Sequence, residues 1–425
     1  MVDFMEKVVS SRTGDSYYKT THPSGVTIYV WPRPDYTGAY AVFGAKVGSI
    51  DDNFGINKGG ITKVPAGIAH FLEHKLFENE DSDAFERYAK TGASANAYTS
   101  FDRTCYLFSC TERFEESFEI LLNFVQSPYF TEDTVQKEQG IIGQEIKMYQ
   151  DSPEWCVMFN LLKACYHTHP ARIDIAGTVE SIAEITADTL YQCYNAFYNP
   201  ANMVISVAGN ITPEQVYAIS DKTLREREPV ELTRKMPDEP ATVAQPVIEQ
   251  KFDVGIPLIY IGFKEDPQKN PPADTARDRI LTEILLHCVA GQTTRLYRAL
   301  MDDGLINQSF SMEYMTMPGL RMEMFGGESM DPEQVCLRIC AEIGRLRSEG
   351  ISEEAFECAR RSVYGGLVAA LASNDNVASA MAEAHFYGQN IFDTAEAAAT
   401  ATLDDIQSLL EIRMDAARCA MSIVR

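Results

Sequence analysis

Hydrophobic and polar residues follow two different periods along the first 220 residues. Residues 26–31 (VTIYVW) alternate in polarity and run into two prolines, a pattern that predicts a strand ending in a turn. Three further segments have the character of strands: 39–49, 93–100 and 104–110. The helical period covers 67–78, a short acidic stretch near 81–91, 112–126 and 131–150. This mixture predicts an α+β fold, in which helices pack on a mainly antiparallel sheet.

The apolar periodicity is interrupted after residue 220 and resumes after residue 250. Residues 221–250 carry four prolines among charged residues and have no apolar period, which predicts a linker. Beyond it, strands are expected at 258–263, 308–315, 320–325 and 421–425, and helices at 275–289, 293–301, 331–348, 352–372 and 376–387. Because this order echoes the first half, we predict two homologous domains, 1–220 and 251–425.

Composition limits the class of protein. The chain has 425 residues, of which 45% are hydrophobic and 23% charged, enough for two hydrophobic cores. The start has no apolar block and no run approaches a membrane span, so we expect a cytoplasmic protein without a membrane partner. A formal net charge of −24 argues against nucleic acid as a partner.

Ten cysteines occur without any Cys-x-x-Cys pair, which excludes a zinc ribbon and fits a reducing compartment. Cys336 and Cys340 are four residues apart and could share one helix face. We nevertheless expect isolated core thiols, the ordinary state of a free cysteine.

The segment GIAHFLEHKLFE, residues 67–78, carries the clearest chemical signal. His70 and His74 are four residues apart in a predicted helix, so both imidazoles lie on one face and can reach one metal ion. Glu73 lies beside them, close enough to hold a water on that ion; this is the inverted order of the His-Glu-x-x-His zinc motif. Two histidines on a partly solvated helix could also arise by chance. The metal site is favoured because the chain has only 7 histidines and these two lie in an apolar run.

A catalytic zinc ion needs a third protein ligand, which is commonly a carboxylate. Glu138 and Glu145 are seven residues apart, two helical turns, and project from one face of the predicted helix 131–150. Spacing alone does not select the ligand, since other acidic and imidazole groups could approach after folding. The full set of candidates is Glu78, Glu80, Glu138, Glu145, His167 and His169.

An ordered series of motifs between residues 40 and 210 resembles the pitrilysin/insulinase metallopeptidases. The motifs are Gly48-Ser49, GIAHFLEHKLF, NAYTS with Thr104 and Tyr106 after it, EQGIIGQE and FYNPANMVISVAGN. The segments HKLFENEDSD and GASANAYTSFDRT are similar to those of a bacterial branch of proteins of roughly this length, the YfmH-like proteins. The resemblance implies zinc held by His70, His74 and Glu145, with Glu138 in support. Cobalt or manganese could take the same place, although two histidines and a glutamate at tetrahedral geometry suit zinc best.

The same resemblance implies hydrolysis of unfolded or short peptides, in which Glu73 moves the proton of a water activated by the metal. The substrate would add as a strand beside residues 93–100, on Ser94, Ala95, Asn96, Ala97 and Tyr98. In the family, an arginine and a tyrosine of the second domain also contact substrate. Arg295 and Arg298 are present here, but the expected tyrosine position holds Leu305 or Asn307.

The same resemblance implies that the protein has a partner subunit. Two-domain members of the family commonly close a chamber with a second chain, so a homodimer or a heterodimer with a related subunit is expected. The alternative to a peptidase is an accessory subunit without activity. Such subunits typically lose motif residues, whereas all four residues of the predicted site are retained here.

Overall fold

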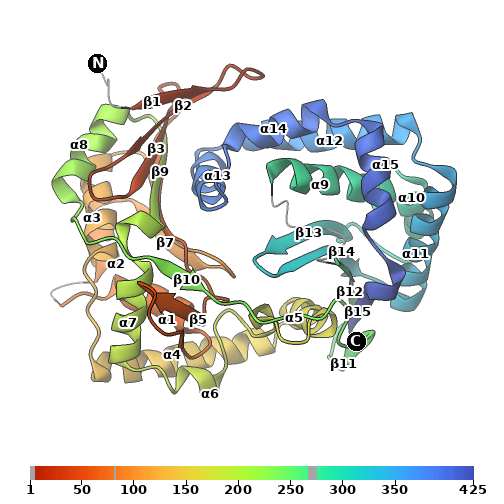
Figure 1. The fold of residues 1–425 in the computed structure, drawn as a ribbon, viewed down its shortest axis with the longest axis horizontal. Helices are drawn as coiled ribbons and strands as arrows, with labels where there is room; N and C mark the ends of the chain where they lie inside the picture. The colour runs from red at the N-terminus through yellow and green to blue at the C-terminus, as the bar shows by residue number, and fades with distance from the viewer. Residues whose placement is uncertain (1–4, 81–82, 267–274) are drawn as a thin grey trace. The chain divides into compact units, whose positions relative to one another are not determined.

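The computed structural model describes residues 5–80, 83–266 and 275–425, which form two compact units (Figure 1). The first unit comprises the described residues of Met1–Ile146, Ile173–Lys235 and Ala370–Ile391. The second comprises those of Lys147–Arg172, Met236–Ala369 and Phe392–Arg425. Neither unit is a continuous stretch of chain.

The first unit is built on a seven-stranded sheet in the order β1-β2-β3-β9-β4-β8-β7. Only β3 and β9 pair in parallel; the other neighbours are antiparallel. Strand β7 lies at the edge, paired with β8 alone among the described strands. The strands are β1 Glu6–Val9, β2 Ser16–Thr21, β3 Thr27–Pro32, β4 Ala39–Ala45, β7 Ser94–Thr99, β8 Thr104–Cys110 and β9 Met203–Gly209. A small sheet of β5 Asn53–Ile56, β6 Thr62–Lys63 and β10 Leu232–Arg234 has the order β10-β5-β6.

Helices cover both faces of the seven-stranded sheet. Alternate residues of β3, such as Ile28 and Val30, enter a core shared with the helices of the first half of the chain. On the opposite face, the Tyr29 hydroxyl lies 3.2 Å from Nδ1 of His385, in a helix from the second half. The helices of this unit are α1 Ile68–Phe77, α2 Ala84–Thr91, α3 Phe114–Val125, α4 Glu132–Gln150, α6 Val179–Ile182, α7 Ala187–Phe197, α8 Pro213–Thr223 and α13 Asn374–Phe386, with α4 continuing into the second unit.

The second unit has a five-stranded sheet in the order β11-β15-β12-β14-β13, in which only β11 and β15 are parallel. Helix α5, Pro153–Cys165, covers one face, where Gly262 of β12 leaves room for Leu161 and Cys165. The strands are β11 Val247–Gln250, β12 Leu258–Lys264, β13 Ser311–Met317, β14 Leu320–Glu328 and β15 Cys419–Val424. The other helices are α9 Ala276–Ala290, α10 Arg295–Asp302, α11 Pro332–Glu349, α12 Glu353–Ala370, α14 Ile391–Thr400 and α15 Leu403–Ile412.

The predicted fold class is confirmed: both sheets are mainly antiparallel and carry packed helices. Each half of the chain lends a helix to the other unit, α5 from the first half and α13 from the second. The division into homologous domains at residues 220 and 251 stays a prediction. The linker expected at 221–250 contains the short strands β10 and β11, and its role as a boundary between domains also stays a prediction.

The acidic helix expected near 81–91 begins at Ala84; residues 81–82 lie outside the described part. Within the described ranges, no helix is long and apolar enough to cross a membrane.

Candidate metal centre

Helix α1 carries two of the predicted ligands on one face. The ring centroids of His70 and His74 are 4.5 Å apart. Gly67 caps the N-terminus of the helix at φ 90°, and a Cβ there would come 2.3 Å from the carbonyl oxygen of Ala176. Only glycine fits both the left-handed backbone and this close approach, so Gly67 sets the direction in which α1 starts.

Helix α4 brings a carboxylate to the two imidazoles. Nε2 of His70 lies 3.7 Å from one carboxylate oxygen of Glu145, and Nε2 of His74 lies 3.5 Å from the other. One donor atom from each of the three residues lies within 4.8 Å of the others. Glu145 follows His74 by 71 positions in sequence, so packing of α4 against the unit, and not local spacing, brings it to the two histidines.

Glu138 orients one of the imidazoles. It precedes Glu145 by two helical turns on α4, and its carboxylate accepts a 3.0 Å hydrogen bond from Nδ1 of His74. With the proton of the ring on Nδ1, Nε2 keeps its lone pair and faces Glu145. Carboxylate–histidine pairs of this kind fix the orientation of metal-binding imidazoles.

Burial keeps His70 neutral. Its pKa is lowered to about 3, first by desolvation and then by the charge of His74. Desolvation also acts to lower the pKa of His74, but the Glu138 hydrogen bond and the charges of nearby carboxylates outweigh it, so that pKa is raised. Neutral imidazole is the form that binds a metal ion.

The donor set fits a zinc ion. Nε2 of His70 stands beyond hydrogen-bond distance of Glu145, and its buried Nδ1 has no hydrogen-bond partner among the described residues. A buried imidazole without hydrogen bonds is costly, and a cation held between the three groups would satisfy Nε2. Two imidazoles and one carboxylate are a ligand set of catalytic zinc sites.

Glu73 lies on the same helix, between the two histidines. Its side chain is 9% exposed, and burial raises its pKa above the ordinary value. The hydroxyl of Thr99, in β7, donates a 2.6 Å hydrogen bond to its carboxylate. Thr99 was absent from the predicted site residues; the signal for it was its place directly after Tyr98 in the predicted strand. Glu73 is therefore a carboxylate held in a fixed orientation beside the donor group.

The other ligand candidates lie elsewhere. Glu78 forms an ion pair with Lys75, and Glu80 does not belong to the donor group. His167 and His169 belong to the second unit, where their Nε2 atoms contact the carbonyl oxygens of Thr242 at 3.2 Å and Pro318 at 2.8 Å.

The predicted substrate strand is the edge strand β7. All five predicted residues, Ser94, Ala95, Asn96, Ala97 and Tyr98, belong to it. The N–H of Ala97 donates a 2.9 Å hydrogen bond to the side chain of Asn96. Since successive N–H groups of a strand point to opposite edges, this N–H faces the open edge, where a further strand can add.

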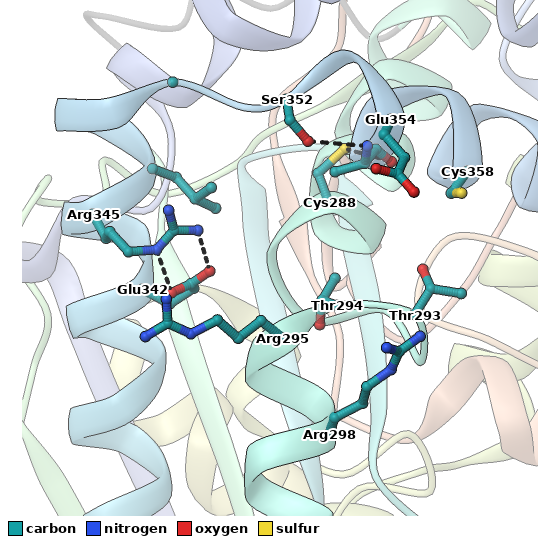
Figure 2. Close-up of a pocket in the computed structure, with 13 residues that line it drawn as sticks. Cys288, Thr293, Thr294, Arg295, Arg298, Glu342, Arg345, Ser352, Glu354 and Cys358 are labelled. Carbon is teal, nitrogen blue, oxygen red and sulfur yellow. Dashed lines mark hydrogen bonds and ion pairs between the residues drawn. The ribbon is translucent and has the colours of Figure 1, made fainter.

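Arg295 and Arg298 belong to the second unit. Both lie in α10 and line a pocket of about 480 Å³ together with Thr293 and Thr294 (Figure 2). Arg345, on the pocket wall, forms a 2.7 Å ion pair with Glu342. Of the two positions considered for the family's tyrosine, Leu305 packs against the core of this unit and Asn307 donates a hydrogen bond to Glu328.

Two family profiles match successive parts of the chain. A profile described as insulinase, peptidase family M16, matches residues 56–179, which include the donor group. A profile described as the peptidase M16 inactive domain matches residues 184–363.

Individual proteins agree with these profiles. The chain is 39% identical to a protein of Bacillus subtilis named uncharacterized zinc protease YmfH, over 95% of both chains. A crystal structure of a putative M16-like peptidase from Alicyclobacillus acidocaldarius matches with a TM-score of 0.93 at 34% identity, over 98% of this chain and 99% of that one. The fold also matches the crystal structure of pitrilysin, with a TM-score of 0.75 at 15% identity, over 99% of this chain and 46% of that one. The chain therefore belongs to the insulinase family of peptidases, family M16.

Proposed function

We propose that the protein is a zinc-dependent endopeptidase that hydrolyses peptide bonds in unfolded or short peptides. The observation that carries this proposal is the convergence of His70, His74 and Glu145, with donor atoms within 4.8 Å of one another beside the carboxylate of Glu73. The Bacillus subtilis relative, which is named a zinc protease, supports the same activity.

Each residue of the centre has a distinct task. His70, His74 and Glu145 would hold the zinc ion, and Glu138 keeps Nε2 of His74 directed toward the place between them. When bound, zinc supplies a Lewis acid for the scissile carbonyl and lowers the pKa of a water. Glu73 accepts the proton of that water and later donates it to the leaving amine. The Thr99 hydroxyl holds the Glu73 carboxylate in place for both transfers.

The substrate would bind as an additional strand along β7. Main-chain hydrogen bonds at an open strand edge tolerate many side chains but require an extended peptide. Thr99 belongs to this strand and contacts Glu73, so a peptide on the open edge of β7 lies beside the proposed general base. Folded proteins cannot offer such a segment, which restricts the substrates to unfolded or short chains. Arg295 and Arg298 would contribute positive charge to substrate binding from their pocket in the second unit.

We further propose that the protein works as a dimer, with itself or with a related subunit. The chain aligns over 99% of its own length with 46% of pitrilysin, so two such chains together approach the length of that protein. We also place the protein in the cytoplasm, a reducing compartment in which its ten cysteines would remain thiols.

Cleavage of an unstructured, internally quenched peptide tests the proposed activity. The zinc-loaded wild type should cleave it, and Glu73→Gln should reduce kcat by about 10²–10⁴-fold with zinc content unchanged, because only the proton acceptor is lost. Glu86→Gln, an exposed carboxylate of α2, is the matched control and should cleave normally. Equal cleavage by wild type and Glu73→Gln would remove the assignment. A zinc-loaded wild type without cleavage would favour the accessory subunit.

A further inference from the structure

Three thiols of the second unit gather at one place. Cys336 and Cys340 lie four residues apart on α11, and Cys419 begins β15. Their sulfur atoms all lie within 4.8 Å of one another. The expectation of isolated core thiols is therefore wrong for these three. Sequence spacing predicted the shared helix face of the first two, but the approach of the third depends on how β15 packs.

The backbone that carries the three cysteines is well fixed. Strand β15 is held in the sheet by β12, with Cys419 opposite Phe263. The guanidinium of Arg418, the preceding residue, donates a 3.1 Å hydrogen bond to the carbonyl of Lys264. After the strand, Arg425 forms a 3.1 Å ion pair with Glu333 in the first turn of α11. The chain is thus tied to β12 before the strand and to α11 after it.

The three thiols differ from the deeply buried cysteines of the protein. Each is half-buried, so an ion from solvent can reach it. Cys193, in contrast, is buried. Thiolate is the form of cysteine that binds metal ions.

The geometry is close to that of a metal–thiolate centre. Three sulfurs around a zinc ion, each about 2.3 Å from it, are about 3.8 Å apart. The separations within 4.8 Å therefore need only small side-chain rotations to reach coordination distance. Thiolates select soft cations such as zinc and copper(I) over magnesium or calcium.

We propose that Cys336, Cys340 and Cys419 form a second metal site, which binds a thiophilic d¹⁰ cation through three thiolates. Binding displaces the remaining thiol protons to solvent. The group contains three protein ligands within the described ranges. A trigonal ion such as copper(I) would be saturated by them, whereas a tetrahedral ion such as zinc would keep one position for solvent. The site lies in the second unit and is independent of the imidazole centre in its ligands.

Cadmium titration of the reduced full-length protein tests this site. Cadmium bound to thiolates gives an ultraviolet charge-transfer band, to which the imidazole and carboxylate ligands of the first centre do not contribute. The wild type should develop this band and saturate it at one equivalent of sulfur-bound cadmium. Cys419→Ser should lose it, and so should Cys340→Ser, because each variant leaves only two sulfur ligands.

Cys358→Ser is the matched control, because that cysteine is exposed and outside the cluster. It should keep the band of the wild type. Thermal unfolding of the metal-free variants checks that each one is folded, and a variant that fails this check is replaced by Cys336→Ser. Titrating zinc and copper(I) against a chromophoric chelator then shows which ion the site prefers.

Three results would overturn the proposal. The first is a wild type without the band, and the second is a band that persists in folded Cys419→Ser and Cys340→Ser. The third is a loss of two thiols on mild oxidation together with no metal binding in the reduced protein, which would make the cluster a disulfide pair.

Discussion

At the scale of single residues, the proposed metal centre depends on two residues that are not themselves proposed ligands, Glu138 and Thr99. His74 presents Nε2 to Glu145 because its Nδ1 is held by Glu138. Glu73 is held by Thr99. Two of the six groups at the site therefore act by positioning others, which ordinary metal-ligand spacing does not reveal.

Replacing the carboxylate that holds His74 should weaken metal binding without abolishing it. We expect Glu138→Gln to lower zinc affinity about 10–100-fold, because an amide holds the ring less firmly and leaves its nitrogen less basic. Competition with a chromophoric chelator measures this. Asp133→Asn, an exposed carboxylate on the same helix, should leave affinity unchanged. Equal affinities for Glu138→Gln and the wild type would show that Glu138 does not orient the ligand.

A second residue-scale prediction concerns acid stability. Burial, and then the charges of Lys19 and Lys46, lower the pKa of His385 to about 4, whereas an unfolded histidine has a pKa of about 6.5. The unfolded chain binds the proton more tightly, so the neutral ring contributes stability above pH 6.5 that is lost as the pH falls toward 4.

The shift corresponds to about 3 kcal/mol between those two pH values. We expect His385→Gln to lose less stability than the wild type over this range, by an amount of that order. Urea unfolding at pH 7 and pH 4, followed by the fluorescence of Trp31 in the sheet that contacts His385, compares the two proteins. An equal loss of stability in the wild type and in His385→Gln between pH 7 and pH 4 would contradict this role of His385.

At the scale of elements, β7 combines an open edge with a contact to the centre. Its inner side pairs with β8, while the N–H of Ala97 meets only the side chain of its neighbour Asn96. Strands with an unpaired edge are sites of association, and a peptidase can use that property to bind its substrate. The strand also carries Thr99, so the proposed substrate binding and the proposed proton transfer would share one element.

Removing one N–H group from the open edge of β7 should weaken the binding of a peptide substrate without lowering the stability of the protein. Ala97→Pro deletes a donor that faces the open edge, and proline is tolerated on edge strands. We expect the KM for an unstructured peptide to rise about tenfold, the effect of one lost main-chain hydrogen bond, while the unfolding midpoint changes little. Asn96→Pro, whose N–H faces β8, should lower the midpoint instead. An unchanged KM in a folded Ala97→Pro variant would exclude substrate binding along this edge.

Elements also show where prediction from sequence succeeded and where it failed. The period of α1 placed His70 and His74 on one face, and the pattern of α4 placed Glu138 and Glu145 together. The pairing of the two helices came from family resemblance, because spacing within a helix says nothing of its neighbour. Strand β10 was missed since three residues have no measurable period, and its partner β5 lies far away in sequence.

At the scale of the whole molecule, the two units are interlinked through their sequence. Helix α5 of the first half completes the second unit, and α13 of the second half completes the first. The amphipathic pattern of each helix predicts that one face is buried, but not which sheet buries it. Neither half of the chain therefore contains all the elements of a unit, and we expect residues 1–220 alone to lack the cover that α13 gives to β3, β4 and β9.

The proposed dimer belongs to this scale as well. We expect multi-angle light scattering of the purified chain, alone or with a related subunit, to give the mass of two chains at micromolar concentration. One chain has a mass of 47.4 kDa. A mass of one chain under both conditions would contradict the dimer.

The central claim is that His70, His74 and Glu145 hold one zinc ion, and anomalous scattering at the zinc absorption edge tests it most directly. In crystals of the full-length protein equilibrated with zinc, we predict an anomalous peak about 2.0–2.2 Å from Nε2 of both histidines and from a carboxylate oxygen of Glu145. No peak among these three residues at saturating zinc would contradict the account.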